Sequence, residues 1–455
     1  MSESVYTAEI KQSITGRPDA RFVWLCNFEV ENEWAHNYVG LPVPRLSATT
    51  STVQRMEELG ALIAEPIDYL LLGKGLDEEY RRYVERLGLG LPTELVAQQG
   101  VPDARTSQSV LGSPKLLRQL SELAEQGAFL MPMGASAEAQ KITDATGLRM
   151  AVPDADIFER VNSKIYSRRL VEELGLRAIP GYACETVEEL RDALGDGPSK
   201  EQPVIVKDAF GVSGKGLVVL DSPIKAQQLQ RMVDQRARRT GIEALHVVVE
   251  RFLAKRFDLN YQLTIDRGGG VRFDFVKEAP TAGGVHKGHI IPPALTATQY
   301  QEIAQSAEKI GARLYVDGFF GVVGVDALLG ADDLVYPVLE INARLNMSSF
   351  QGRVTERFLR PGHAALAKHY PLRLSRPVSF DEVHKALGEL AVAPEGGTGL
   401  VITCFGTVNA QAATSTPFYG RLYAILFAAD RTALTELDMR VTDALGVLNA
   451  AKWKS

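Results

Sequence analysis

Several features that mark other protein classes are scarce or missing in this chain of 455 residues. It has three cysteines, Cys26, Cys184 and Cys404, without the paired spacing of a zinc site or a disulfide framework. No uninterrupted apolar run approaches the roughly 20 residues that span a bilayer, and no basic stretch followed by an apolar one opens the chain. We therefore expect simple thiols, no membrane partner and a cytoplasmic protein.

Positive charge is not in excess either. Lysine and arginine number 50 against 56 acidic residues, a net charge of -6, so the chain lacks the electrostatic footprint of a nucleic-acid-binding protein. Hydrophobic residues make up 45% and charged residues 23%, an ordinary globular composition. The length predicts two to four domains and a substantial core.

Four polar side chains stand among strand-forming residues late in the chain. Segments 319–328 and 334–341 are predicted strands joined by the polar turn 330–333, and so a hairpin. Asp326 lies in the first strand, while Glu340, Asn342 and Arg344 occupy alternate positions and share one face. Two carboxylates and an amide suit Mg²⁺, and arginine suits phosphoryl or carboxylate oxygens. A polar face that is merely solvated is the alternative.

A glycine-rich loop lies between two predicted strands further upstream. Residues 203–207 form a strand that ends in Lys207, and a second strand follows at 217–220. Glycines allow backbone N–H groups to approach phosphate oxygens, which Lys207 would also reach. The candidate loop residues are Gly211, Ser213, Gly214, Lys215 and Gly216. Because a strand follows, this is neither a Walker A loop nor a Rossmann fingerprint; a plain hairpin turn is the alternative.

Two further segments suit a nucleoside and its phosphates. The strand 246–253 delivers Glu250 into a short linker, where Arg251, Phe252 and Leu253 would offer backbone groups to an adenine edge. Glu250 would accept from the exocyclic amine, and Asp258 would address ribose hydroxyls. The segment 161–176 is a predicted amphipathic helix that is ended by Gly175 and carries Lys164 in its first turn, after a cap at 162 or 163. A buried strand with surface charges and a solvated lysine are the alternatives.

Two more segments are candidates for substrate binding. The basic, glycine-flanked loop 281–289 carries His286 and Lys287, which would stabilise charge on a transferred phosphate or a donor carboxylate. A mobile surface loop is the alternative. After Arg344, hydroxyls and amides of Asn346, Ser348 and Ser349 are expected to line the acceptor side.

The order of these elements, from the lysine helix to the acidic hairpin, resembles the ATP-grasp superfamily over about residues 158–370. The resemblance implies that Lys164 and Lys207 contact nucleotide phosphates, that the glycine loop covers them and that Glu250 to Leu253 hold adenine. It implies ATP and Mg²⁺ as cofactors, with Mn²⁺ as the alternative ion, and Asp326, Glu340 and Asn342 as metal ligands. Some members carry an arginine two residues before the first metal acid. Gly324 stands there in this chain, so oxyanion stabilisation falls to Arg344 or to another group.

The flanking segments 128–133, 399–406 and 418–423 resemble those of the pheganomycin-type peptide ligases. We expect an α/β protein with an N-terminal Rossmann-like parallel-sheet pre-ATP-grasp domain (residues 1–155), a two-lobed ATP-grasp domain (156–375, with lobes at 156–255 and 256–375) and a small C-terminal α+β domain (376–455). Alternating strands and helices at the N-terminus favour a parallel sheet there.

The resemblance implies an ATP-dependent carboxylate-amine ligase that forms an acyl phosphate and couples it to an amino acid or a peptide, in specialised-metabolite biosynthesis. The catalytic residues would be Arg344, Lys207, His286 and Lys287. The expected partners are a small carboxylic acid and an amine or peptide acceptor, and a homodimer is one open assembly state. Alternatives are carboxylation or phosphotransfer on the same fold, and a nucleotide-binding sensor or scaffold without catalysis.

Overall fold

The computed structural model describes residues 4–35, 38–42, 50–97, 104–195, 198–211, 216–282, 285–391, 396–413 and 416–449. A five-stranded sheet near the N-terminus has the order β3-β2-β1-β4-β5, and every pair in it is parallel. Its strands are β1 (Phe22–Leu25), β2 (Tyr69–Leu72), β3 (Thr93–Val96), β4 (Phe129–Pro132) and β5 (Arg149–Met150). The predicted parallel sheet is therefore confirmed.

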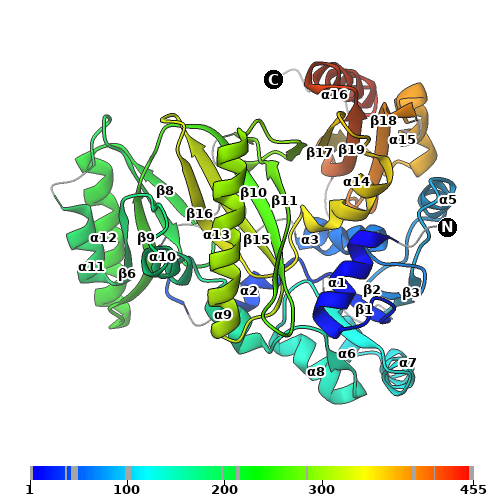
Figure 1. Ribbon diagram of the computed structural model, residues 1–455, viewed down its shortest axis with the longest axis horizontal. Coiled ribbons are helices and arrows are strands. Elements are labelled where there is room, and N and C mark those ends of the chain that lie inside the picture. The colour runs from blue at the N-terminus through cyan, green and yellow to red at the C-terminus, as the bar shows by residue number, and fades with distance from the viewer. Residues whose placement is uncertain are drawn as a thin grey trace.

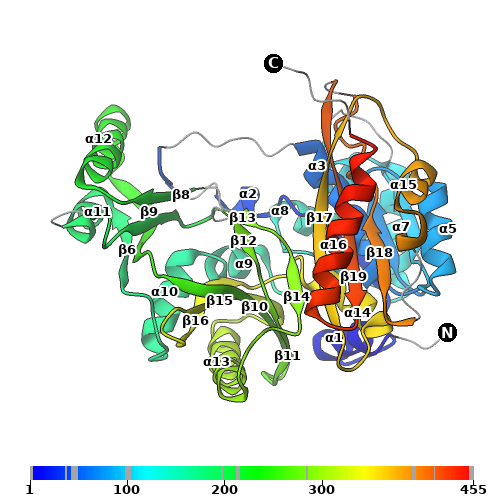
Figure 2. The ribbon, with the colours of Figure 1, turned by 90° about the horizontal axis from the view of Figure 1, so that it is seen from above.

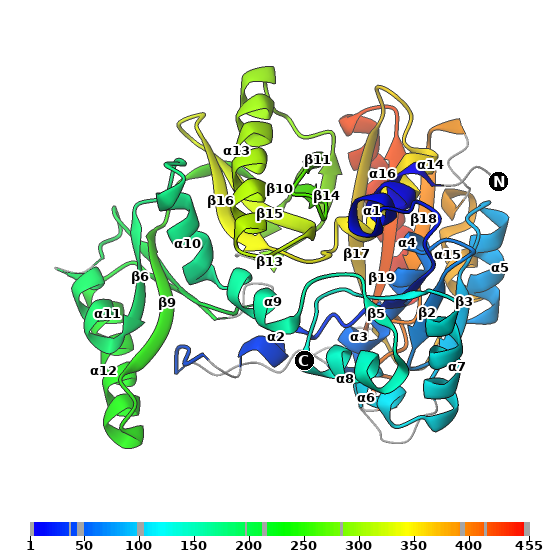
Figure 3. The ribbon, with the colours of Figure 1, turned by 60° about the horizontal axis from the view of Figure 1, so that its bottom comes forward.

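Helices surround this N-terminal sheet. They are α1 (Val5–Thr15), α2 (Glu31–Trp34), α3 (Thr50–Arg55), η2 (Met56–Leu59), α4 (Gly60–Ile63), α5 (Glu78–Arg86), α6 (Thr106–Leu111), α7 (Pro114–Glu125) and α8 (Ala137–Thr146). Figure 3 shows α1 beside α14 (Gly352–Phe358), so the N-terminal unit packs against a much later part of the chain.

A four-stranded antiparallel sheet forms the outer lobe on the left of Figure 1. Its order is β6 (Gly181–Thr186), β9 (Ala244–Arg251), β7 (Val204–Asp208) and β8 (Leu217–Leu220). Helices α11 (Val187–Leu194) and α12 (Pro223–Thr240) pack on it through a separate hydrophobic core that includes Cys184, Val206 and Leu229. Helices α9 (Ala155–Val161) and α10 (Lys164–Glu173) lead into this lobe, and α10 contacts both β9 and β16.

An eight-stranded antiparallel sheet forms the centre of the molecule. In order, its strands are β16 (Val335–Asn342), β15 (Gly321–Gly330), β10 (Lys255–Ile265), β11 (Val271–Glu278), β14 (His289–Ile291), β17 (Ala364–Leu374), β19 (Phe418–Ala428) and β18 (Gly399–Cys404). The short hairpin β12 (Thr281–Ala282) and β13 (Val285–His286) lies outside it. Helix α13 (Ala297–Val316) packs on β10, β11 and β16 (Figure 1).

The last part of the chain extends this same sheet instead of starting a new one. Helix α16 (Arg431–Gly446) lies along β17 and β19, as Figure 2 shows, with α15 (Phe380–Leu387) next to it. The short helices η3 (Ser349–Gln351) and η4 (Gly388–Ala391) complete the described elements. The domain boundaries expected at residues 155 and 375 stay a prediction.

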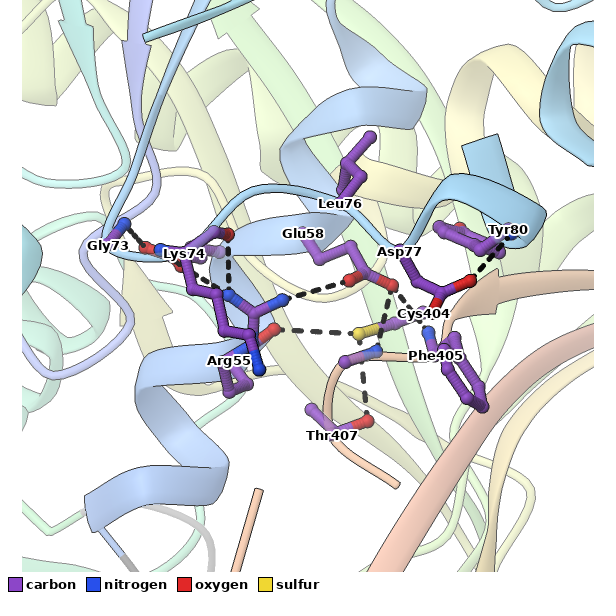
Figure 4. A network of polar contacts seen from close by, with 12 residues as sticks. Arg55, Glu58, Gly73, Lys74, Leu76, Asp77, Tyr80, Cys404, Phe405 and Thr407 are labelled. Carbon is purple, nitrogen blue, oxygen red and sulfur yellow. Dashed lines mark hydrogen bonds and ion pairs between the residues drawn. The ribbon is translucent and has the colours of Figure 1, made fainter. Parts of the chain in front are cut away.

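Two buried glutamates sit where the N-terminal unit meets the end of β18 (Figure 4). Glu58 Oε1 accepts hydrogen bonds from the amides of Phe405 (2.5 Å) and Gly406 (2.9 Å). Glu57 instead accepts from the Gly73 amide at 2.9 Å, within its own unit. Arg55 donates to both carboxylates, at 3.0 Å to Glu57 and 3.3 Å to Glu58. This polar network ties the first sheet to the last strand of the central sheet.

The structure describes the three cysteines and the apolar content of the helices. Cys26, Cys184 and Cys404 are free and buried, as expected for thiols that pack in a core. Within the described ranges, no helix is long and apolar enough to cross a membrane. A cytoplasmic location stays a prediction.

Candidate active site

Strands β15 and β16 form the predicted hairpin, and their register brings its acidic side chains together. Asp326 lies directly opposite Glu340, and Asn342 lies opposite Gly324. Paired residues of an antiparallel sheet point to the same face. Asp326 accepts hydrogen bonds from Asn342 (Nδ2 to Oδ2, 3.3 Å) and from Asn260 of β10 (Nδ2 to Oδ1, 2.8 Å). The three predicted metal ligands therefore share one face of the sheet.

The chemistry of this face suits a hard divalent cation. Burial raises the pKa of both Asp326 and Glu340, and nearby Lys164 opposes the rise at Glu340. A bound cation would favour the ionised carboxylates. In the part of the chain that the structure describes, no group of three His, Cys, Asp or Glu side chains is placed to hold a metal. A Mg²⁺ ion on this pair would therefore use the Asn342 amide, water and phosphate oxygens as its other ligands.

The two lysines predicted to contact phosphates reach the site from different elements. Lys164 is the first residue of α10, and its Nζ donates to Glu340 Oε1 at 2.6 Å and to the Gly211 carbonyl at 2.9 Å. Lys207 lies on β7, and its Nζ donates to Glu250 Oε2 at 2.6 Å. Each lysine is thus ion-paired with a carboxylate that was itself predicted to bind a ligand.

A cavity lies where α10 meets β7, β9 and β16. It is lined by Lys164, Ser167, Arg168, Val171, Ala178, Ile179, Lys207, Val248, Glu250, Val338 and Leu339. Three predicted nucleotide-binding residues, far apart in the sequence, therefore face one cavity. An apolar lining with a few charged groups is typical of a small-molecule site.

Glu250 contacts a second cation that the sequence analysis did not single out. Its Oε1 lies 3.8 Å from Nη1 of Arg168, whose Nη2 donates to the Gly181 carbonyl at 2.9 Å. Arg168 follows Lys164 by four residues, so both occupy one face of α10. That spacing is the signal that would have identified it. The recognition of adenine by Glu250 stays a prediction.

Two backbone amides after Glu250, those of Arg251 and Phe252, already donate hydrogen bonds to carbonyl groups. Arg251 ends β9, and its N–H donates to the Pro180 carbonyl at 2.9 Å. The Phe252 N–H donates to the Pro203 carbonyl, also at 2.9 Å, while its ring is half exposed. Leu253 packs against a small apolar cluster with Ile179, Leu328 and Tyr336. The amides of Arg251 and Phe252 would thus already be occupied when an adenine lies at this linker.

Asp258 of β10 contacts the predicted basic loop. Asp258 accepts a hydrogen bond from Thr281 Oγ1 at 2.6 Å. Burial lowers the pKa of His286 to about 4, and the charge of Asp258 opposes that shift. The His286 ring lies 4.4 Å from that of His289, whereas Lys287 is exposed. The predicted roles of Asp258, His286 and Lys287 stay predictions.

The ends of the glycine loop are placed beside the site. Gly211 accepts from Lys164, as described above. Gly216 has φ +72°, and a Cβ there would come within 2.6 Å of the Asp208 carboxylate, so this position requires glycine. Ser213, Gly214 and Lys215 lie outside the described residues.

Arg344 points back into the hairpin and out to the N-terminal unit. Its Nη2 donates to Asn342 Oδ1 at 2.9 Å and pairs with the Glu31 carboxylate of α2, and its Nη1 donates to the Leu345 carbonyl at 3.0 Å. The guanidinium is therefore next to the predicted metal ligands. Glu31 was missed because no local pattern distinguishes it from an exposed helix residue.

The predicted acceptor residues are buried and tied to the central sheet. Ser348 Oγ donates to Asn260 Oδ1, and Ser349 Oγ donates to Gln262 Oε1, each at 2.7 Å. Asn346 Oδ1 accepts from the Ser348 amide at 2.9 Å. These contacts connect the turn after Arg344 to the asparagine that supports Asp326. Whether the side chains touch a substrate stays a prediction.

Lys277 is a buried residue that the sequence analysis also missed. It lies opposite Asn260 in the β10–β11 pair, and its Nζ donates to the Ser348 carbonyl and to Gln351 Oε1, both at 3.0 Å. Burial alone lowers its pKa to about 7. Lys277 stands two residues after Phe275 in a strand of mixed apolar and charged residues, which is a weak signal in the sequence.

Two family models match this chain. Residues 163–367 match the carbamoyl-phosphate synthase L chain, ATP binding domain, and residues 56–148 match the pre ATP-grasp domain. The chain belongs to the ATP-grasp superfamily. The first match begins next to Lys164 and includes the cavity and the acidic hairpin, so the candidate site lies in the ATP-binding part of an ATP-grasp protein.

Curated relatives share part of this ATP-grasp chain. The [butirosin acyl-carrier protein]–L-glutamate ligase of Niallia circulans is 29% identical over 202 residues, which are 44% of this chain and 46% of that protein. A formate-dependent phosphoribosylglycinamide formyltransferase of Vibrio vulnificus is 27% identical over 279 residues, 59% of this chain and 67% of that protein. The match thus spans less than half the length of the butirosin ligase.

Solved structures extend the likeness over most of the chain. An ADP complex of N5-carboxyaminoimidazole ribonucleotide synthetase superposes with a TM-score of 0.54 at 12% identity, covering 87% of this chain and 95% of that one. Biotin carboxylase from Campylobacter jejuni also gives 0.54, at 13% identity, covering 88% and 93%. At such low identity these neighbours establish the ATP-grasp fold and leave the reaction open.

Proposed function

We propose that this ATP-grasp protein is a carboxylate-amine ligase, which activates a carboxylic acid as an acyl phosphate and couples it to the amine of an amino acid or a peptide. The observation that carries the proposal is the assembly of one cavity with two lysines beside the facing carboxylates Asp326 and Glu340. The similarity to the [butirosin acyl-carrier protein]–L-glutamate ligase supports this reaction and a role in specialised-metabolite biosynthesis.

The first step requires positioning and charge neutralisation more than covalent catalysis. A carboxylate oxygen of the acid attacks the γ-phosphorus of ATP, which yields the acyl phosphate and ADP. Lys164 and Lys207 would hold the phosphates, and Arg344 would hold the developing acyl phosphate. Mg²⁺ bound by Asp326, Glu340 and Asn342 would supply charge neutralisation at the β and γ oxygens.

The ion pairs of the ligand-free site support this assignment. Lys164 and Glu340 have only 5% and 21% of their side chains exposed, so separating them without new partners would leave buried charges. A cation on Glu340 and a phosphate on Lys164 would replace the lost pair on both sides. Nucleotide and metal are therefore expected to bind together more tightly than either binds alone.

The second step is attack of an amine on the acyl phosphate, which gives an amide and phosphate. An acyl phosphate hydrolyses in water, so the site must be closed when it forms. The location of Arg344 between the central sheet and α2 suits such a closed site, because both units then border the reacting group.

Other ATP-grasp reactions are the second candidate, because one relative is named a formate-dependent formyltransferase and structural neighbours include carboxylases. Incubation with Mg-ATP and a panel of acids and amines separates these reactions by their products. A ligase gives ADP and phosphate that depend on an acid, a hydroxamate when hydroxylamine is present and an amide with its own acceptor. Bicarbonate-dependent carboxylation, or phosphate transfer to the acceptor, would contradict the proposal.

The metal assignment is tested by Glu340→Gln. This variant keeps the shape of the side chain but removes the charge, so turnover should fall by at least about 100-fold while the circular dichroism spectrum stays near that of the wild type. Because Lys164 loses its carboxylate partner, the unfolding midpoint should fall, and turnover is compared well below the midpoint of the variant. Glu302→Gln is the matched control, since Glu302 forms a half-exposed pair with Arg177 on the surface. Near-normal turnover by Glu340→Gln would contradict the assignment. ATP binding without turnover on any acid would instead favour a sensor.

A further inference from the structure

The short helix α2 brings N-terminal residues to the centre of the molecule. In Figures 2 and 3 it lies between the four-stranded sheet and the N-terminal sheet. Its first residue, Glu31, pairs with Arg344, and only 11% and 10% of these side chains are exposed. Arg344 in turn contacts Asn342 of the hairpin. One bridging side chain therefore separates Glu31 from the residues placed around the reacting phosphate.

Helix α2 is held in place by burial of its last residue. The Trp34 side chain is 2% exposed, its Nε1 donates to the Ala135 carbonyl at 2.9 Å, and its ring lies 6.0 Å from that of Phe158. A Cβ added at Gly134 would come within 2.8 Å of the Trp34 ring. This close packing fixes the helix, and with it the position of Glu31.

The segment that carries Glu31 also lies where an open parallel sheet normally binds ligands. In the order β3-β2-β1-β4-β5, the chain adds β2 and β3 on one side of β1 and then β4 and β5 on the other side. Open parallel sheets bind ligands beyond the carboxyl ends of the strands at such a point. Asn27, just after β1, bridges to the segment after β4 by donating to the Gly134 carbonyl (2.9 Å) and accepting from the Met133 amide (3.1 Å). Glu31 follows four residues later, on the side of Arg344.

Carboxylate is the main chemistry that this segment offers. Glu29 has a buried Oε1 without a hydrogen-bond partner among the described residues, and burial raises its pKa to about 7. A segment with carboxylates and a partner-free acceptor atom suits a cation with N–H donors, and an ammonium group is such a ligand.

We infer that Glu31 binds the ammonium group of the acceptor substrate and takes its proton before the amine attacks the acyl phosphate. This inference rests on the proposed ligase function. Once the acyl phosphate occupies Arg344, Glu31 exchanges its guanidinium partner for the ammonium. The acceptor amine then lies next to the reacting carbonyl because Arg344 and Glu31 are direct neighbours.

This placement determines which bonds form and break and where each proton goes. The ammonium gives one proton to the Glu31 carboxylate and becomes a neutral amine. Its nitrogen attacks the acyl carbon, so a C–N bond forms and the C–O bond to phosphate breaks, with the electron pair going to the phosphate. The departing phosphate takes the second N–H proton, and Glu31 returns the first proton to solvent.

The test compares two nucleophiles in wild-type protein and in Glu31→Gln. Hydroxylamine is largely uncharged near neutral pH and does not need a base, whereas an ammonium acceptor does. In Glu31→Gln, amide formation should fall at least about 100-fold further than acid-dependent hydroxamate formation, because a general base usually contributes about that factor and only the amide reaction needs one. The amide rate should recover as the pH approaches the pKa of the acceptor amine itself.

Two further variants make the test specific. Glu31→Asp keeps the carboxylate and should retain a larger part of the amide rate than Glu31→Gln. Asn32→Ala, at an exposed position of the same helix, should behave like wild type in both assays. The variant Glu31→Gln should also release more ADP per amide formed, because unused acyl phosphate hydrolyses.

The outcomes separate this inference from the proposed function. Equal loss of hydroxamate and amide in Glu31→Gln would mean that Glu31 acts only by positioning Arg344, and would overturn the inference. Unchanged amide formation in Glu31→Gln would overturn it as well. Absence of any acid-dependent hydroxamate in the wild type would instead contradict the ligase function itself.

Discussion

At the scale of single residues, the cationic side chains of the candidate site form ion pairs with carboxylates. Lys164 pairs with Glu340, Lys207 with Glu250 and Arg344 with Glu31. These groups are largely buried, and a buried charge that loses its partner is strongly destabilising. Ligands that carry phosphate and metal together can replace both members of a pair. The site is therefore arranged for exchange of partners, which a set of unpaired cations would not require.

The buried lysine of β11 leads to a pH-dependent prediction. The pKa of Lys277 is about 7 in the folded protein against an ordinary value of 10.5, so between these values the unfolded chain binds the extra proton and stability rises with pH. Lys277→Met removes this term. From pH 6 to pH 10, wild type should gain about 4 kcal/mol relative to the variant. Urea unfolding at several pH values measures the difference.

The substitution also removes the Lys277 donor from Gln351 Oε1 and from the Ser348 carbonyl, which keeps the Gln351 amide at 3.3 Å. This cost does not change with pH. The informative quantity is thus the change of the stability difference with pH. Lys385→Met, at an exposed lysine, should show no comparable slope. A constant difference between wild type and Lys277→Met would show that Lys277 titrates like an exposed lysine.

The sequence allowed some site residues to be predicted and concealed others for a physical reason. Lys164 and Lys207 stand at the start of a helix and near the end of a strand, where local spacing signals their position. Glu31 meets Arg344 across 313 positions of the chain. Such a contact depends on how separate units pack, and no pattern within a helix or strand encodes it.

At the scale of elements, the turn after Arg344 explains the unusual glycine at position 324. A Cβ at Gly324 would lie 1.7 Å from Asn346 Nδ2, so the Asn346 side chain fills the space above β15. That side chain accepts from the Ser348 amide, and Ser348 reaches Asn260 beside the metal pair. Gly324 therefore permits a polar turn to pack directly onto the hairpin.

Substitution of this glycine tests the arrangement. Gly324→Ala should displace Asn346 and destabilise the protein by about 1 to 3 kcal/mol, the usual cost of overpacking. Turnover should fall too, because Ser348 and Asn260 support Asp326. Urea unfolding and ADP release are the measurements. In the double variant Gly324→Ala with Asn346→Gly, the added methyl group should cost much less, and an additive effect of the two changes would contradict the proposed contact.

Local signals account for the elements that were predicted correctly. Helix α10 has the expected cap, since Ser163 Oγ accepts from the Ile165 amide at 3.2 Å, and Gly175 takes φ +60° just after it. The hairpin β15–β16 follows from its alternating pattern and polar turn. The continuation of the central sheet into β17, β19 and β18 was not predicted, because pairing between distant strands leaves no trace within either one.

At the scale of the whole molecule, the N-terminal unit and the end of the central sheet depend on each other. Strand β18 is an edge strand that, among the described residues, pairs with β19 alone, so few backbone contacts hold it. The Glu58 carboxylate accepts from the amides just beyond it, and Arg55 balances the charge (Figure 4). Glu58 is fully buried, and this burial raises its pKa.

Removal of this tie should loosen one end of the molecule without affecting the nucleotide cavity. Glu58→Ala leaves the Phe405 and Gly406 amides without their acceptor and removes one of the two carboxylates that Arg55 contacts, at a cost of about 3 kcal/mol or more. Hydrogen exchange should speed up in β18 (Gly399–Cys404). The affinity for Mg-ATP should stay within about threefold of wild type, because the cavity is lined by α10, β7, β9 and β16 and not by β18.

The adjacent glutamate provides the matched control for this experiment. Glu57 is also buried, but its carboxylate accepts hydrogen bonds from Thr106 Oγ1 at 2.5 Å and from the Gly73 amide at 2.9 Å. Both donors lie within the N-terminal unit. Glu57→Ala should therefore lower stability and speed exchange near β2 while β18 keeps its protection. If both variants released β18 equally, the two units would unfold as one body, and the junction at Glu58 would have no separate role.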